Sequence, residues 1–197
     1  MPMAARTLVF IDEANLLQMG HLIGKMTDWA RVREFLAEGR TVVEFVVYAG
    51  LPPNLPEWFE LRQKRDKFLN WLEQHGFLVV RKYGKPAEAG SYKATVDLLM
   101  AIDAIDLCEA IKPEDAVLVS GDGDFAHLAL KLRRKGIRVT AAGVLELVAE
   151  DLKSASNAML DMTELFQSFG DYRSLSRPVP AAVKPKLAVL PTGSLTA

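Results

Sequence analysis

The sequence has little of what most zinc and disulfide sites require. Its 197 residues include one cysteine, Cys108, and three histidines that lie far apart in the chain. A single cysteine excludes an internal disulfide and a cysteine-based zinc site, and three scattered histidines argue against a histidine-rich zinc site. Cys108 falls on the apolar side of an expected helix, so we expect a buried packing thiol.

An excess of charge and long apolar runs are also missing. Lys and Arg number 24 and Asp and Glu 25, so the formal net charge is −1 and no global positive field attracts nucleic acid. No apolar run approaches the roughly 20 residues that span a bilayer. The N-terminal residues lack the apolar core and cleavage site of a signal peptide. We expect a cytoplasmic protein without a membrane partner.

What is present is an alternation of short apolar segments with longer amphipathic ones. The short segments are almost continuously apolar, which is typical of strands buried on both faces of a parallel sheet. The alternation predicts an α/β fold with a doubly wound, mainly parallel sheet of about five strands flanked by helices. The expected strands are Thr7–Ile11, Val42–Tyr48, Phe77–Lys82, Ala116–Ser120 and Arg138–Ala142, and the expected helices are Trp29–Glu38, Pro56–His75, Ala94–Ile111, Phe125–Lys135 and Glu146–Ser156.

The chain divides by composition into residues 1–170, which we expect to form one domain, and residues 171–197. The second part is rich in proline and lacks core periodicity, so we expect a flexible tail. Residues 160–169 are expected to add a short segment at the sheet edge. Within the helix Ala94–Ile111, the expected buried stripe is Leu98, Ala101, Ile102, Ile105 and Cys108.

Acidic residues follow two of the expected strands. Asp12 ends the first strand, Asp122 and Asp124 follow the strand Ala116–Ser120, and Asp97 begins a helix. In an open parallel sheet, ligands bind beyond the carboxyl ends of the strands, so these carboxylates are expected to meet there if their strands are neighbours. Carboxylates held close together repel, and a divalent cation removes that conflict. Oxygen ligands with few histidines indicate Mg²⁺ or Mn²⁺.

The turn between Asp122 and the next helix favours a phosphate site. Gly121 and Gly123 are expected to adopt unusual φ values in a tight turn. The N-terminus of the following helix offers free N–H groups and the positive end of the dipole. Metal, carboxylates and phosphate together suit hydrolysis of a phosphodiester bond.

Three of these four acidic residues also have a purely structural explanation. Asp124 fits the N-cap of its helix, Asp12 with Asn15 fits a cap, and Asp97 fits a partner of the helix dipole. Asp103 and Asp106 fall away from the expected stripe, and Glu13 lies beside Asp12. We expect these last three side chains to face solvent.

Three blocks of the sequence match the motifs of one known domain family. Phe10 to Asn15 matches an opening F-I-D-x-x-N, and Lys93 with Val96-Asp97, then Leu98 to Asp103, matches a central K…V-D…D element. Ser120 to Phe125 closely matches S-G-D-x-D-F, and Leu128, Gly136, Val139 and Gly143 continue that block. Together these blocks resemble the NYN domain, in the LabA-like or DUF88 group of the PIN-like nuclease superfamily, and the resemblance covers about residues 7–166.

The resemblance implies a PIN-like sheet, an Mg²⁺- or Mn²⁺-binding acidic pocket and endoribonuclease activity. It assigns Asp12, Asp97, Asp122 and Asp124 to the metal site and gives Asn15 the task of orienting water, metal or phosphate. Ser120 and Lys93 become phosphate contacts under the same resemblance. Whether the protein forms a homodimer is left open.

The basic side chains are expected to form two local groups rather than one extended surface. Lys82 and Lys85, with Arg81, are expected at the edge that carries the carboxylates, where they can hold the phosphates of an RNA strand. Tyr83 and Tyr92 flank this segment and suit stacking on unpaired bases, although packing explains them equally well. A second basic group is expected to be a solvated helix face, namely Arg62, Lys64, Arg65 and Lys67. The small basic group predicts single-stranded rather than duplex RNA.

Two other classes of function fit less well. A catalytically silent RNA-binding or regulatory protein with this fold would keep the carboxylates without turnover, and it is the main alternative. A haloacid-type phosphatase would need a second aspartate two residues after Asp12, where Ala14 stands. A receiver domain would need a lysine after the last strand, and Val139–Gly143 has none.

Overall fold

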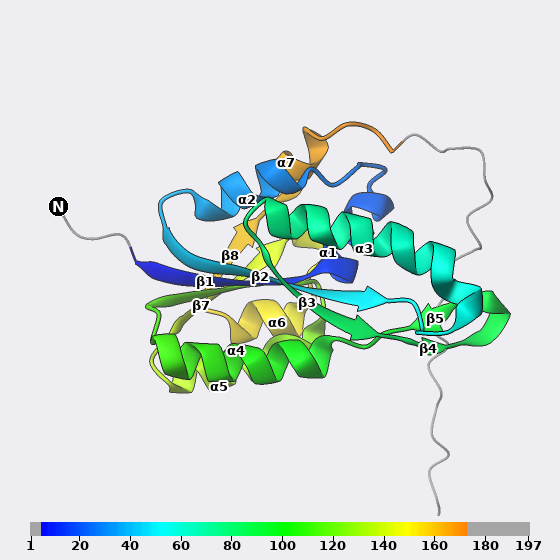
Figure 1. Cartoon of the computed structure of the whole chain (residues 1–197). Helices are drawn as coiled ribbons and strands as arrows, with labels where there is room; N and C mark the ends of the chain where they lie inside the picture. Colours follow the sequence, from blue (N-terminus) through cyan, green and yellow to red (C-terminus); the bar gives the residue numbers. More distant parts are fainter. Residues whose placement is uncertain (1–4, 173–197) are drawn as a thin grey trace, which may run out of the picture.

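A computed structural model describes residues 5–172 of the chain. Its centre is a six-stranded sheet in the order β3-β2-β1-β6-β7-β8, in which all neighbouring strands are parallel. Figure 1 shows α1, α2, α3 and α7 over one face of the sheet and α4, α5 and α6 over the other. The predicted α/β fold with a doubly wound parallel sheet is confirmed. The strands are β1 (Arg6–Asp12), β2 (Thr41–Leu51), β3 (Leu78–Tyr83), β6 (Asp115–Val119), β7 (Arg138–Gly143) and β8 (Ala158–Asp161).

The helices alternate with the strands along the chain. Gly76 ends α3 at a φ of 81°, and Gly136 has the same φ after α5; this left-handed conformation is one that glycine adopts without steric cost. The helices are α1 (Glu13–Leu22), α2 (Trp29–Ala37), α3 (Phe59–Gln74), α4 (Asp97–Ile111), α5 (Ala126–Arg134), α6 (Glu150–Ala155) and α7 (Thr163–Gln167). Short 3-10 turns, η1 (Pro56–Trp58), η2 (Glu88–Gly90), η3 (Gly123–Phe125) and η4 (Leu145–Leu147), complete the order.

The path of the chain places a switch point between β1 and β6. From β1 the chain builds outward through β2 to β3, and it then crosses back along α4 to pair β6 with the free side of β1. Ile11 lies opposite Val119 in this pairing. Asp12 and the loop after Val119 therefore leave the sheet side by side, at the position where open α/β sheets bind ligands.

The core fills both sides of the sheet. Every residue of β6 is buried, as is every residue of β1 except Arg6, in agreement with the expectation of strands covered on both faces. Cys108 is buried, as predicted. Within the described residues, no helix is long and apolar enough to cross a membrane.

The structure adds three local features to the expected fold. Residues 158–161 pair with β7 as a sixth strand at the sheet edge, close to the edge segment expected over residues 160–169, before the short α7 begins. The helix α1 directly follows Asp12, where no helix was expected. A two-stranded hairpin, β4 (Lys85–Pro86) with β5 (Tyr92–Lys93), was also not expected.

The buried stripe of α4 is rotated from the expected one. Met100, Ala104 and Cys108 face the core, whereas Leu98 is 68% exposed and Ile102 is 50% exposed. The helix is apolar nearly all round, so its sequence pattern did not distinguish the face that packs on the sheet. Apolar side chains therefore remain on the outer surface of α4.

The end of the described chain contacts the domain. Lys25 pairs with Asp171 at 2.7 Å, and the amide of Tyr172 donates to the carbonyl of Gly24 at 2.7 Å. The ring of Tyr172 lies edge-on to His21, with 4.8 Å between centroids. The expected flexible tail lies, from residue 173 onward, outside the described residues.

Candidate functional site

Asp12 ends β1 and caps α1. Its Oδ1 accepts a hydrogen bond from the Asn15 amide N–H at 3.1 Å, so the structural explanation as a cap is correct as far as geometry goes. The residue is 3% exposed. Burial raises the pKa of Asp12 from 3.8 to about 6, and the charges of Asp97 and Glu13 also raise it, while the hydrogen bonds from Asn15 oppose the rise. A buried carboxylate of this kind favours a cation beside it.

Asn15 joins the two strand ends that form the site. Its side-chain Nδ2 donates to Asp12 Oδ2 at 3.3 Å, and its Oδ1 accepts from the Gly121 N–H at 2.9 Å. Each end of the amide makes one hydrogen bond. In this geometry Asn15 positions Asp12 and the loop after β6 relative to each other, and one N–H of the amide is left for the role that the resemblance implies.

The loop after β6 is shaped by its own side chains. Asp122 caps the turn η3 by accepting from the Asp124 N–H at 2.9 Å, so the cap expected at Asp124 belongs to Asp122. Ser120 is fully buried, and its hydroxyl accepts from the Asp122 N–H at 3.1 Å. The hydroxyl is closed to a phosphate, and the predicted phosphate contact of Ser120 is replaced by a role in holding Asp122.

Gly121 is required for space rather than for an unusual φ. Neither Gly121 nor Gly123 has a positive φ, so that expectation is wrong. A Cβ at Gly121 would lie 2.5 Å from the Leu147 carbonyl oxygen and 3.1 Å from Asn15 Oδ1. A side chain here would displace the loop that carries Asp122 and break its link to Asp12.

Asp97 is the common neighbour of the other carboxylates. It is the first residue of α4, and partial burial raises its pKa, followed by the charges of Asp122 and Asp124, while Lys82 lowers it. Its charge in turn helps to raise the pKa of Asp12. The structure thus brings all four predicted acids into one electrostatic group at the switch point.

The charge of Lys82 acts on Asp97, but none of the four carboxylates takes part in a salt bridge within the described residues. Within residues 5–172, no three Asp, Glu, His or Cys side chains are grouped tightly enough to form a ready metal cluster. An all-oxygen group of this openness fits Mg²⁺, which keeps several waters and needs only one or two carboxylates.

Lys82 approaches the group from the β3 side, and two further lysines lie in the hairpin that follows β3. Lys82, near the end of β3, acts on the pKa of Asp97, and Lys85 and Lys93 lie opposite each other in the hairpin. Both hairpin lysines are exposed. Arg81 instead pairs with Glu73 at 2.5 Å and donates to Asn70 at 2.8 Å, so its side chain is bound to α3 rather than directed to the site.

Glu13 was expected in solvent and is fully buried. Arg65 of α3 forms a bidentate pair with it, with one Nη1–Oε1 distance of 2.6 Å, and also donates to the Gly50 carbonyl at 3.1 Å. Arg65 is therefore not a solvated surface residue. This contact holds the first residue of α1, next to Asp12, against α3, and nothing in the spacing of the sequence indicated it.

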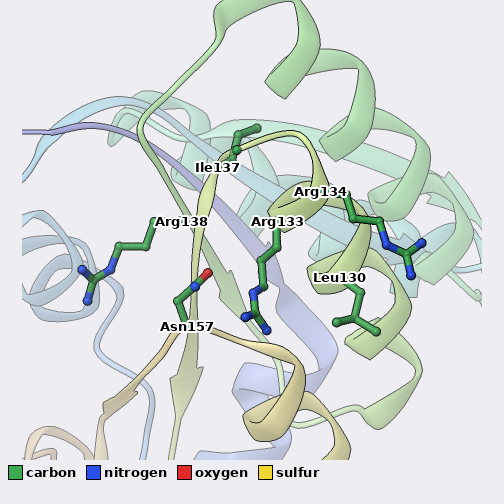
Figure 2. Close-up of a pocket in the computed structure, with 7 residues that line it drawn as sticks. Leu130, Arg133, Arg134, Ile137, Arg138 and Asn157 are labelled. Carbon is green, nitrogen blue, oxygen red and sulfur yellow. The ribbon is translucent and has the colours of Figure 1, made fainter.

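A cationic hollow lies at the opposite end of the strands from the carboxylates. It holds about 540 Å³ between the end of α5 and the start of β7. Figure 2 shows that the guanidinium groups of Arg134 and Arg138 point away from each other, and Arg133 donates to the Ala155 carbonyl at 2.7 Å. These side chains do not converge on one point, and they lie at the end of the strands away from the carboxylates.

The NYN domain model matches residues 6–164, which is most of the chain. The chain belongs to the NYN domain family. The matched range includes the four carboxylates, Asn15 and the lysines of the hairpin. The NYN domain is one of the PIN-like nuclease folds, which connects this chain with nuclease and RNA-related functions.

One curated protein and one solved structure are similar to this chain over most of its length. The chain is 26% identical over 192 residues to the low amplitude and bright protein LabA of Synechococcus elongatus, covering 93% of this chain and 96% of LabA. It also resembles the crystal structure of a protein of unknown function from Vibrio parahaemolyticus. That likeness has a TM-score of 0.66 and 24% identity, covers 82% of this chain and 95% of the other, and concerns the fold alone.

Proposed function

We propose that this NYN protein is a ribonuclease that uses Mg²⁺ or Mn²⁺ to hydrolyse phosphodiester bonds in single-stranded RNA. The observation that carries the proposal is the group of carboxylates at the switch point, which act on one another's pKa and form no salt bridge within the described residues. Structural carboxylates are usually paired or exposed, whereas Asp12 is buried among like charges.

The residues of the site would have two separate roles, namely metal binding and positioning. Asp12, Asp97, Asp122 and Asp124 would hold the metal, partly through water, and Asn15 would keep Asp12 and the Asp122 loop in register. A bound Mg²⁺ or Mn²⁺ would supply the charge that acidifies a water and stabilises the leaving oxygen. In the reaction, the water oxygen forms a bond to phosphorus, the bond to one ribose oxygen breaks, and that oxygen takes up a proton.

The lysines would bind the substrate on one side of this centre. Lys82, Lys85 and Lys93 offer positive charge to the phosphates that flank the scissile one. The adjacent rings of Tyr83 and Tyr92 offer surfaces for unpaired bases; Tyr83 is 55% exposed, whereas Tyr92 is half-buried. An unpaired strand bends into a concave site at lower cost than a duplex, which favours single-stranded RNA.

One observation favours a second function, namely RNA binding or regulation without turnover. The described residues hold no preformed cluster of three metal ligands. A protein that binds RNA through the lysines alone would need no such cluster. The ribonuclease would cleave RNA in a reaction that depends on the carboxylates, whereas the second function involves no cleavage.

The deciding experiment is cleavage of labelled single-stranded RNA with Mg²⁺ or Mn²⁺ by the wild-type protein and by Asp122→Asn. Asparagine still accepts the Asp124 N–H, so the cap and the fold should be kept while one negative charge is lost. We expect the cleavage rate to fall by at least about 100-fold, the order seen when one transition-state contact is removed.

Asp106→Asn is the matched control, because Asp106 is an exposed carboxylate on α4 outside the group. It should cleave at the wild-type rate. Binding of RNA by the wild-type protein without metal-dependent cleavage would support the regulatory function. Equal cleavage by wild type and Asp122→Asn, with contaminating ribonuclease excluded, would contradict the proposed ribonuclease.

A further inference from the structure

An apolar cleft runs from the carboxylate group along the outer side of the sheet, between α4 and α5. It holds about 410 Å³. The two helices lie side by side on the face opposite α1 and α3 (Figure 1). Leu98, Ala101 and Ile105 line it from α4, and Leu128 with Lys131 line it from α5. None of these residues was assigned a role in the proposed hydrolysis.

The mouth of the cleft consists of site residues. Asp97 and Asp124 both line it, so whatever occupies the cleft lies directly beside the carboxylates. Beyond them, Leu98 is 68% exposed and Ile102, one turn further along α4, is 50% exposed. Exposed apolar side chains that continue an apolar cleft indicate a ligand with an apolar face.

The other helix adds positive charge along the same cleft. His127 and Lys131 lie one turn apart on α5, and both are exposed. Arg134 lies about one further turn on, at the end of that helix. From Asp124 to Lys131 the rise is about 10 Å, enough for a base together with its sugar. The cleft is thus acidic at the metal end, apolar in the middle and cationic at the far end.

We propose that the α4–α5 cleft binds a nucleotide of the RNA strand next to the scissile phosphate. The base lies against Leu98, Ala101 and Ile105, and the following phosphate lies near Lys131. This inference rests on the proposed RNA substrate. The strand then crosses the carboxylate group, with one side on the lysines of the hairpin and the other in the cleft.

The chemistry of the lining also predicts the kind of recognition. The apolar middle offers no donor or acceptor for a base edge, so the base is held by its faces and by its exclusion from water. Such contacts accept every base, because each has an apolar π-face. The cleft should therefore contribute affinity without sequence preference.

The test measures binding of a fluorescent single-stranded oligoribonucleotide by anisotropy, with Mg²⁺ and in parallel with EDTA. Leu98→Gln keeps a good helix former and removes the apolar surface, and Lys131→Glu reverses the charge. We expect each variant to weaken binding at least about fivefold. Lys131→Glu should also flatten the dependence of binding on salt.

A second probe tests the base contact itself. Replacing the bases of the oligonucleotide by hydrogen should weaken binding to the wild type more than binding to Leu98→Gln, because that variant has already lost the apolar surface. Leu22→Gln and Lys67→Glu are the matched controls, since both side chains are exposed on the other face of the sheet. Both controls should bind as the wild type does.

The outcomes separate the cleft from the proposed hydrolysis. If Leu98→Gln and Lys131→Glu bind like the wild type while Asp122→Asn loses cleavage, the cleft is wrong and the ribonuclease stands. If both variants lose binding and no cleavage is found, the cleft stands and the ribonuclease is wrong. If Leu98→Gln instead changes only the oligomeric state, the cleft is an interface between copies, and the proposal is overturned.

Discussion

At the scale of single residues, the site depends on a carboxylate whose ionised form is disfavoured by burial in the folded protein. Asp12 lies 3% exposed beside two other acids, and its pKa is raised to about 6. Asn15 supplies its hydrogen bonds without supplying charge. The native fold therefore binds the Asp12 proton more tightly than the unfolded chain does, where the pKa is about 3.8.

This difference predicts how stability depends on pH. Because the folded pKa lies above the unfolded one, the contribution of Asp12 falls as the pH rises from about 4 to about 6, and it stays low above that range. Asp12→Asn cannot ionise and still caps α1, so in EDTA at pH 7 it should be more stable than the wild type by up to about 3 kcal/mol.

Urea unfolding at pH 3.5 and pH 7 measures the effect. The difference between the two proteins should become small at the lower pH, where Asp12 is protonated in the native state and mostly protonated in the unfolded state. Mg²⁺ at pH 7 should also narrow the difference in unfolding free energy, because Mg²⁺ that binds only the native wild-type protein stabilises that protein. A difference of equal size at both pH values would mean that Asp12 is not the group that titrates.

At the scale of elements, α1 is held to α3 by a buried ion pair. Glu13 is fully buried, and Arg65 joins it to the carbonyl of Gly50 at the end of β2. Removal of one partner from such a pair leaves a charge with little access to water. The pair lies one residue from Asp12, so it also determines where α1 begins.

Glu13→Ala should lower the free energy of unfolding by about 3 kcal/mol, because it leaves the Arg65 guanidinium without its partner. Denaturant titration provides the measurement, and Glu109→Ala is the control. Glu109 pairs with Lys135 on the surface, so its removal should change the free energy of unfolding far less. Glu13→Leu combined with Arg65→Met should recover part of the lost stability. Equal losses in Glu13→Ala and Glu109→Ala would show that the buried pair stabilises the fold no more than a surface pair does.

At the scale of the whole molecule, the charge is nearly balanced, with a formal net charge of −1. Long-range attraction to a rigid duplex is therefore weak, and the proposed binding of RNA would rely on local groups such as the lysines at the β3 side of the site. Lys82→Glu combined with Lys85→Glu should weaken binding of single-stranded RNA and flatten its salt dependence while leaving metal binding intact. Cleavage of matched single-stranded and duplex RNA at equal rates, over a range of salt, would contradict the expected preference.

The tail gives a second prediction at this scale. Truncation after Tyr172 should leave the melting temperature and metal binding of the domain unchanged, because the removed segment lacks core periodicity. Truncation after Gly170 should lower the melting temperature slightly, since it removes the Lys25–Asp171 pair and the contact between Tyr172 and His21. A large loss on truncation after Tyr172 would show that residues 173–197 pack on the domain.

The sequence alone determined the alternation of strands and helices, the parallel sheet and the acids that gather at its edge. These follow from local patterns: apolar runs mark buried strands, and carboxylates after parallel strands end at one edge. The tertiary structure decided the rest. Only packing shows that Glu13 is buried against Arg65, that Ser120 faces inward, and that α4 leaves Leu98 outside. Each of these depends on contacts between segments far apart in the chain, which a local pattern does not carry.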